Sequence, residues 1–161
     1  YFAAIVSAKE RIYITSPYFV PDQSILMALK TAALSGVDVK IILPGIPDYK
    51  IVHWASMSYL TSIIEAGVKV YLYQKGFMHA KILLIDGVVA SVGTTNMDMR
   101  SFNLNFEVNA LIYDKGIVKR LEDDFYTDLQ DSRMVTHEEC LNKGLLCRFK
   151  ESSARLLSPI L

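Results

Sequence analysis

A histidine and a lysine stand two residues apart at the start of the apolar segment 78–86. In a β-strand, residues i and i+2 point to the same face, so the side chains of His79 and Lys81 are expected to project together. An imidazole beside an ammonium group suits a site that attacks and holds an anion. These two residues are therefore the first candidates for catalysis.

A hairpin is predicted directly after them. The Asp-Gly pair at residues 86–87 is typical of a two-residue turn, and the chain is expected to return along residues 88–92 beside the first strand. Gly93 follows, where a backbone can approach a ligand closely. Thr94 and Asn96 then supply a hydroxyl and an amide. The hairpin is expected to bring both toward the histidine and lysine.

The spacing of these residues resembles the signature of the phospholipase D superfamily. That signature asks for His-x-Lys-x4-Asp and, after six further residues, for Gly, a small hydroxyl residue or Gly, any residue and Asn. Every fixed position is filled between His79 and Asn96. The continuation over 100–109 is similar to the C-terminal half of bacterial cardiolipin synthases, and the likeness runs collinearly over 1–161. The full constellation is too specific to arise by chance.

The resemblance implies a phosphodiester substrate, and the roles of the residues follow from the charge that develops on it. A neutral His79 imidazole can attack phosphorus, or an imidazolium can protonate the leaving oxygen. Lys81 and the Asn96 amide can stabilise the equatorial oxygens of the transition state, and the Thr94 hydroxyl can position the phosphate. Glu107 is expected to orient His79 through a carboxylate–imidazole contact, which the resemblance supports.

Three further residues belong to the predicted site with roles that stay open. Asp86 stands among the catalytic residues by its place in the motif, but strand geometry puts it opposite His79 and predicts a structural role in the turn. Tyr18 lies in a segment that resembles an active-site rim, where it either contacts substrate or packs in the core. Arg100 either holds a loop carboxylate or contacts a lipid phosphate.

One histidine is insufficient, because the reaction needs a nucleophile and a general acid on opposite sides of phosphorus. The resemblance implies that the second His-x-Lys comes from an N-terminal half of the same enzyme or from a second copy in a homodimer. The function so implied is a phosphatidyltransferase that forms cardiolipin from two phosphatidylglycerol molecules through a phosphohistidine. The alternatives are a phosphodiesterase acting on nucleic acid, and an inert half that acts only in pairing and substrate binding.

The composition of the 161 residues fits one domain, 1–161, and we expect it to be a fragment of a longer chain. Hydrophobic residues make up 52% and the mean hydropathy is +0.26, which predicts a buried interface or contact with a membrane surface. No apolar run of about 18 residues occurs, so no membrane-spanning helix is predicted. The full-length protein is nevertheless expected at the cell membrane, with this domain on the cytoplasmic side.

The charge balance counts against nucleic acid as a partner. The 17 basic and 17 acidic residues cancel, whereas a duplex-binding surface needs a basic excess. Cys140 and Cys147 are expected to be free thiols, without a disulfide or zinc. No metal or other cofactor is expected, because a lysine and amide donors already neutralise a monoanionic diester.

Alternating strand and helix patterns predict the fold class. Strand, helix, strand, helix, strand over residues 11–73 indicates a parallel start, and the hairpin and a strand over 106–113 add antiparallel partners. The expected fold is α/β, with a mixed parallel/antiparallel sheet and helices on both faces, as in phospholipase D. Helices are expected after the N-caps Asp22 and Asp114 and after a capping box at 136–139. The tail 148–161 is expected to be irregular or briefly helical. Its last part, 155–161, either caps the core, which is the favoured interpretation, or lies on a membrane.

Overall fold

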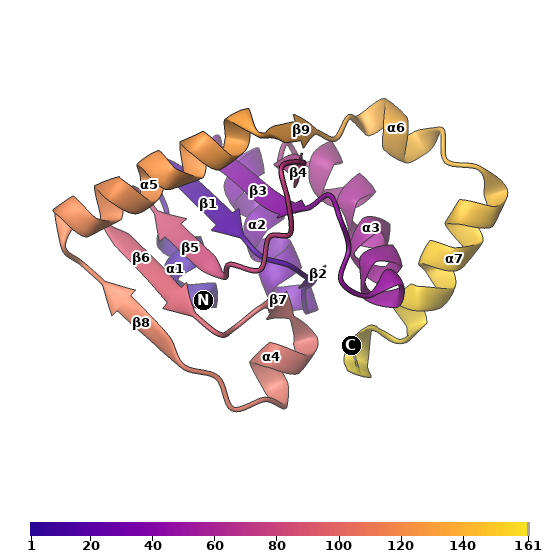
Figure 1. Ribbon diagram of the computed structural model, residues 1–161, viewed down its shortest axis with the longest axis horizontal. Helices are drawn as coiled ribbons and strands as arrows, with labels where there is room; N and C mark the ends of the chain where they lie inside the picture. Colours follow the sequence, from indigo (N-terminus) through magenta and orange to yellow (C-terminus); the bar gives the residue numbers. More distant parts are fainter. Residues whose placement is uncertain (161) are drawn as a thin grey trace.

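The computed structural model describes residues 1–160, which form a seven-stranded sheet with the order β8-β6-β5-β1-β3-β4-β9 (Figure 1). The three central strands pair in parallel, and the strands on either side join them antiparallel. The parallel strands are β1 (Arg11–Thr15), β3 (Asp38–Pro44) and β4 (Lys69–Tyr73). The antiparallel strands are β5 (Ile82–Ile85), β6 (Val89–Gly93), β8 (Asn109–Ile112) and β9 (Ser132–Met134).

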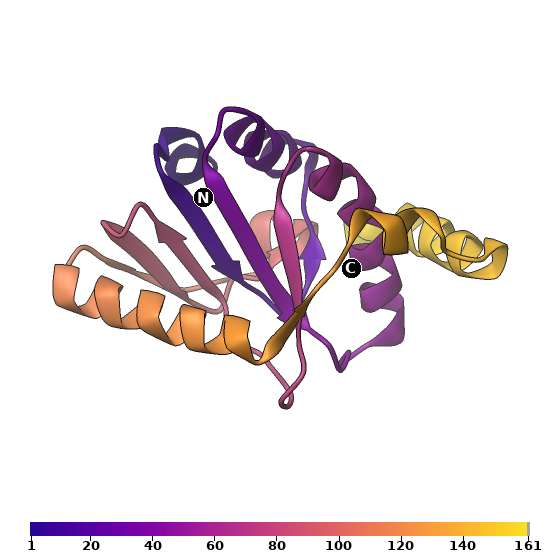
Figure 2. The same ribbon diagram turned by 90° about the horizontal axis from the view of Figure 1, so that it is seen from above.

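Helices cover both faces of this sheet. One face carries α1 (Phe2–Ser7), α2 (Gln23–Leu34) and α3 (Lys50–Glu65), and the other carries α5 (Lys115–Gln130) (Figure 2). The larger apolar core lies on the first face, where the inward side chains of β1, β3 and β4 are fully buried. The predicted mixed sheet between two helical layers is confirmed.

The two predicted N-caps, Asp22 of α2 and Asp114 of α5, are confirmed. The Asp22 carboxylate accepts from the backbone N–H of Ile25 at 2.8 Å and starts α2. The Asp114 carboxylate does the same for Ile117 at the start of α5. Side-chain capping of free N–H groups fixes where each helix begins.

The hairpin between β5 and β6 differs from the predicted two-residue loop. Asp86 and Gly87 occupy a turn with φ of 54° and 67°, closed by the Val88 N–H, which donates to the Ile85 carbonyl at 2.9 Å. The strand ladder resumes with the pair Ile85–Val89, so the loop has three residues. The turn residues were predicted correctly, and Val88 is the added residue that joins the turn to the ladder.

Three short elements were not predicted. β2 (Phe19–Val20) and β7 (Met97–Asp98) form a separate parallel pair, and α4 (Met99–Asn103) follows. The pair is reinforced where the Ser16 hydroxyl accepts from the Met97 N–H at 3.1 Å. Strands of two residues give no periodicity in a sequence. They matter for function because they bring the segment after β1 beside the segment that holds Asn96.

The C-terminal segment is more regular than predicted. After α6 (His137–Leu141), which the expected capping box starts, the chain forms α7 (Leu145–Leu156) and the 3-10 helix η1 (Ser158–Ile160). α7 packs along α3, so of the two states predicted for the tail, irregular or briefly helical, the helical one is confirmed. Leu161, the last residue of that predicted tail, lies outside the described residues. Cys140 and Cys147 are free thiols, as expected.

Candidate active site

His79 and Lys81 lie directly before β5 rather than within it. β1, the strand that pairs with β5, ends at Thr15 opposite Ile82, so residues 79–81 have no partner on that side. The prediction that they belong to a strand is therefore wrong. Only the Lys81 carbonyl continues toward the sheet, accepting from the N–H of Gly93 at 3.3 Å. Both side chains are thus held at the end of the sheet and away from its buried faces.

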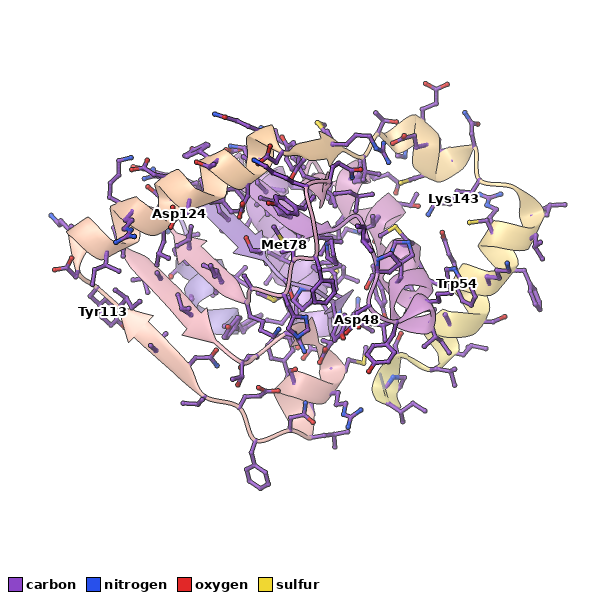
Figure 3. The ribbon with its side chains drawn as sticks, in the orientation of Figure 1. Asp48, Trp54, Met78, Tyr113, Asp124 and Lys143 are labelled. Carbon is purple, nitrogen blue, oxygen red and sulfur yellow. The ribbon has the colours of Figure 1, made fainter. Side chains whose placement is uncertain are left out.

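Aromatic rings flank the exposed imidazole of His79. The ring of Phe77 stacks on it with centroids 5.5 Å apart and an interplanar angle of 16°. Tyr18 meets it edge to face at 6.2 Å. The Tyr18 hydroxyl donates to the carboxylate of Asp48 at 2.7 Å. Asp48 belongs to the loop between β3 and α3 (Figure 3). Tyr18 therefore connects the histidine to a carboxylate that the sequence analysis missed.

The electrostatic surroundings favour a neutral His79. Burial lowers the pKa of the imidazole, the charge of Lys81 lowers it further, and Asp48 offsets part of this effect. Asp48 is thus the carboxylate that acts on His79 in this structure. The signal that could have found it is its place in the loop after a parallel strand, where polar residues from neighbouring strands gather.

Lys81 is folded back onto the backbone at the site. Its ammonium group donates to the carbonyl oxygen of His79 at 2.7 Å. Burial lowers the pKa of this lysine, while the carboxylates of Glu107, Asp98 and Asp48 act in the opposite direction. The side chain is half-buried, and its charge faces these three carboxylates. The ammonium group is therefore fixed to the backbone of His79, in position to hold an anion beside the imidazole.

Gly93 and Thr94 fix the segment that enters β8. The Thr94 hydroxyl accepts from the Val108 N–H at 3.0 Å, and the Thr94 N–H donates to the Val108 carbonyl at 3.0 Å. A Cβ added to Gly93 would collide with the backbone of Val108 and Asn109. The glycine thus allows close approach of another strand, and not of a ligand as we predicted. In this structure Thr94 forms hydrogen bonds with the backbone of Val108, and its predicted contact with phosphate stays a prediction.

Glu107 does not make the predicted contact with His79. Within residues 1–160 its carboxylate accepts from the Asn105 amide at 3.1 Å, and no hydrogen bond joins it to the imidazole. The cause is that β8 starts at Asn109, so Glu107 lies in the loop before the strand. Burial would raise the pKa of this carboxyl, but neighbouring hydrogen-bond donors and the Lys81 charge outweigh it and lower the pKa. The carboxylate of Glu107 therefore interacts electrostatically with the ammonium group of Lys81.

Asn96 carries an unsatisfied buried acceptor. Its side-chain oxygen has no hydrogen-bond partner, and it is the one such buried side-chain atom in the described part of the chain. The neighbouring carboxylate of Asp98 is buried and accepts from the Ser101 N–H at 2.6 Å, and burial raises its pKa. An unpaired buried acceptor costs free energy, and such groups gather where a ligand completes the bonding.

A cavity of about 390 Å³ opens beside these groups, between α3, α4 and η1. Tyr18, Asn96 and Arg100 line it, so it collects three predicted site residues from two distant segments of the chain. The Arg100 guanidinium donates to the side-chain oxygen of Asn105 at 3.3 Å, which is an amide and not the carboxylate considered in the sequence analysis. The other lining residues are Tyr49, Ile51, Val52, Asp98, Asn105 and Ile160.

Asp86 lies at the opposite end of β5 from His79. Its carboxylate accepts from the backbone N–H groups of Lys9, Glu10 and Arg11, each at 2.8 Å. Burial would raise the pKa of Asp86, but these three donors outweigh it and lower the pKa. The carboxylate therefore holds the hairpin turn against the start of β1, which agrees with the structural role predicted from strand geometry.

Two properties of the described residues bear on cofactors and membranes. Residues 1–160 contain no group of three or more His, Cys, Asp or Glu side chains that could hold a metal ion. Over the same residues, every helix is too short or too polar to cross a bilayer.

Comparison with known proteins connects this geometry to a family. Residues 1–129 match the family model described as "Cardiolipin synthase, PLD-like domain". All 161 residues align with a cardiolipin synthase of a Geobacillus species (strain WCH70) at 55% identity, and with cardiolipin synthase 2 of Staphylococcus epidermidis (strain RP62A) at 54%. The chain covers 32% and 33% of these two proteins, so it spans about a third of the length of the curated relatives it matches.

Solved structures share the fold at lower identity. Phosphatidylserine synthase from Haemophilus influenzae superposes with a TM-score of 0.78 over 99% of this chain and 44% of that one, at 20% identity. The phospholipase D family member Nuc from Salmonella typhimurium superposes with a TM-score of 0.72 over 83% of this chain and 87% of that one, at 24% identity. These likenesses establish the phospholipase D-like fold.

Proposed function

The chain belongs to the family of cardiolipin synthase PLD-like domains, and from this premise we propose that it is one catalytic half of a phosphatidyltransferase. The observation that carries the proposal is that His79 and Lys81 stand together at the end of the sheet, and that Tyr18, which contacts His79, lines an open cavity together with Asn96 and Arg100. An imidazole, two cations and an amide suit a phosphodiester monoanion. The substrate is phosphatidylglycerol, and the product is cardiolipin.

The proposed reaction has two displacements at phosphorus. In the first, a histidine nitrogen bonds to phosphorus, and the glycerol oxygen of phosphatidylglycerol leaves with a proton from a second histidine. In the second, a hydroxyl of another phosphatidylglycerol attacks the phosphohistidine, gives its proton to the second histidine and releases the first. The balance is two phosphatidylglycerols to one cardiolipin and one glycerol.

The roles of this chain's residues follow from those steps. The lowered pKa of His79 keeps the imidazole neutral at pH 7, as a nucleophile or a proton acceptor must be. Lys81 and the Asn96 amide stabilise the charge on the equatorial oxygens, and Arg100 and Tyr18 contact the lipid headgroup. Glu107 and Thr94 position Lys81 and the loop around it. Lys81 and Asn96 are partly buried, so their electrostatic effect is larger than it would be in bulk water.

The second histidine comes from another part of a longer protein or from a second copy of this chain. A single domain, 1–161, supplies one His-x-Lys pair, and two-fold pairing brings a second pair to face it. We propose that the assembled enzyme acts at the cytoplasmic face of the cell membrane, where its lipid substrate resides.

The test uses the full-length protein that contains this domain. His79→Ala is expected to abolish cardiolipin formation from phosphatidylglycerol, measured by lipid mass spectrometry, while the Tm stays within about 2 °C because the ring is exposed. Lys81→Met is expected to lower the rate by at least about a hundredfold. Leu34→Glu, an exposed change on α2, is the matched control and leaves the rate unchanged. Cardiolipin formation by His79→Ala at the wild-type rate would overturn the assignment, and salt-sensitive DNA cleavage by the wild type in its place would redirect it to nucleic acid.

A further inference from the structure

α7 is packed with its polar side toward the protein. Glu151 is buried and pairs with Lys143 at 2.8 Å, next to α3. The guanidinium of Arg155 lies over the ring of Tyr59, 4.3 Å from its centroid. An amphipathic surface helix ordinarily turns its apolar stripe inward and its charges outward. The charged side of α7 is the side that meets α3.

The opposite face of α7 is apolar and open to solvent. Leu145, Leu146, Phe149 and Leu156 have exposed fractions between 68% and 86%. At 100° per residue these four positions fall on one side of the helix, roughly opposite Glu151. These four residues form an apolar row along the exposed face of α7 (at the right of Figure 1), with Ser152 and Ser153 between Phe149 and Leu156.

The exposed charges around this row have one sign. Over residues 141–160 they are those of Arg148 and of Lys150, whose ammonium group lies 5.3 Å from the centroid of the Trp54 ring. Lys143 and Glu151 are largely buried in their ion pair, and Arg155 faces α3. A short helix with an exposed apolar face and flanking lysine or arginine side chains is typical of peptides that lie in the interface of an anionic bilayer. Lysine and arginine bury their stems while their charged ends reach the headgroups.

The apolar row is continuous with the catalytic cavity. An apolar hollow of about 190 Å³ lies between α3 and α7, lined by residues that include Trp54, Phe149 and Leu157. Ile51 lines both this hollow and the cavity that holds Asn96. A surface that contacted the α7 row would thus also contact the edge of the active-site cavity. Figure 3 shows Trp54 and Lys143 on this side of the molecule.

We propose that α7 and η1 form a docking surface for an anionic lipid bilayer. The apolar row enters the interfacial region, and Arg148 and Lys150, which flank the row, reach toward the lipid phosphates. Docking in this way places the mouth of the cavity at the depth of the headgroups, where the scissile phosphodiester lies. The inference rests on the proposed function, since a lipid substrate is what requires the cavity to meet a membrane.

Vesicle binding by the 161-residue chain tests the proposal. We expect binding to vesicles of phosphatidylcholine with phosphatidylglycerol, and weaker binding to phosphatidylcholine alone. Replacing Leu146 and Phe149 together by Glu is expected to weaken binding by at least about tenfold, because two charges would enter the interface. Leu34→Glu removes a leucine of similar exposure (73%) from α2 and serves as the matched control. Trp54 is the sole tryptophan of the chain, so a blue shift of its fluorescence reports contact at this face.

Three results would overturn the docking surface. The first is that the double variant binds vesicles as well as the wild type does. The second is that the wild type binds both kinds of vesicle equally. The third is that the double variant changes its oligomeric state in sedimentation while its vesicle binding stays intact. The last would mean that another protein chain covers the face. Turnover of a short-chain, monomeric phosphatidylglycerol by the full-length protein tests the proposed function separately, because that substrate requires no bilayer. Failure there with vesicle binding intact would refute the function alone.

Discussion

Asp86 allows a structural role in the motif to be distinguished from a catalytic one, because this residue belongs to the motif but lies away from the cavity. We consider Asp86→Asn in the full-length protein. Asparagine keeps the size of the side chain and tolerates the positive φ of 54°, so the turn itself is not strained. What changes is the bonding to the start of β1. If one amide oxygen still faces Glu10 and Arg11, the new NH2 group faces the N–H of Lys9, donor against donor.

The magnitude follows from these contacts. A hydrogen bond to a charged group contributes about 1.5–3 kcal/mol in a buried setting, and less where water reaches it. Asp86 is half-buried, so we take the lower end of the range for the lost third bond and a smaller loss for the two that remain. The expected destabilisation is about 2 kcal/mol. For a chain of this size, that corresponds to a fall in Tm of roughly 4–8 °C.

The assay compares stability with turnover per folded molecule. Unfolding by urea is measured for both proteins, together with cardiolipin formation at a temperature where both are folded. We expect the variant to lose stability and to keep its turnover within about threefold, because no part of Asp86 reaches the cavity. An unchanged free energy of unfolding with turnover lost would refute the structural role.

The dependence on pH provides an internal check. The folded-state pKa of Asp86 is lowered, so its contribution to stability is present above the unfolded pKa of an aspartate, about 3.9, and is lost as the pH falls through the folded value. The difference in stability between wild type and Asp86→Asn is therefore expected to shrink below about pH 4. A difference that stays constant down to acid unfolding would contradict the origin we assign to it.

Three other predictions concern packing and charge. Glu151→Gln leaves Lys143 buried without a counter-charge and is expected to cost about 3 kcal/mol in urea unfolding, whereas replacing both residues by apolar ones restores most of the loss. Gly93→Ala places a methyl against backbone that cannot give way, so we expect a loss of about 2–3 kcal/mol by the same measurement, and a wild-type midpoint would contradict the clash. Asp48→Asn removes the carboxylate that offsets the other effects on His79, so the pKa of that imidazole, followed by NMR titration, is expected to fall further; a rise would disprove the pairing.

The sequence predicted well wherever a pattern was local and repeated. The parallel core of the sheet, the Asp22 and Asp114 caps and the hairpin turn were each specified by a few adjacent residues. The motif itself was found by spacing alone. These features need no knowledge of what lies far away in the chain.

The errors arose where distant segments decide the outcome. Glu107 was placed beside His79 because its segment has strand-like residues, but the partner strand β6 pairs only from Asn109 onward. Asp48 was missed because the contact that joins it to the site, through Tyr18, spans 30 positions of sequence. The position of Asp48 in the loop after β3 indicates a residue near the end of the sheet, but only the folded chain shows that its carboxylate meets Tyr18 and acts on His79.

The full length of α7 was not predicted for a related reason, since the tail was expected to be irregular or only briefly helical. Its inward face includes Glu151 and its outward face is leucine-rich, the reverse of the pattern by which a core-facing helix is recognised. Once α7 is known to be a helix, its leucine-rich outward face is the reason to expect that another surface covers it.

The polar attachment of α7 to α3 also bears on how the molecule opens. Most apolar burial in the protein lies under α1, α2, α3 and α5, against the sheet, while α7 rests on one helix through an ion pair and ring contacts. Such a unit can detach while the sheet stays intact, so its amide hydrogens should exchange with solvent at a lower free energy than those of β1 and β3. The C-terminal helices then constitute a foldon of their own. A ligand that bound their outer face would slow exchange there and leave the sheet unaffected.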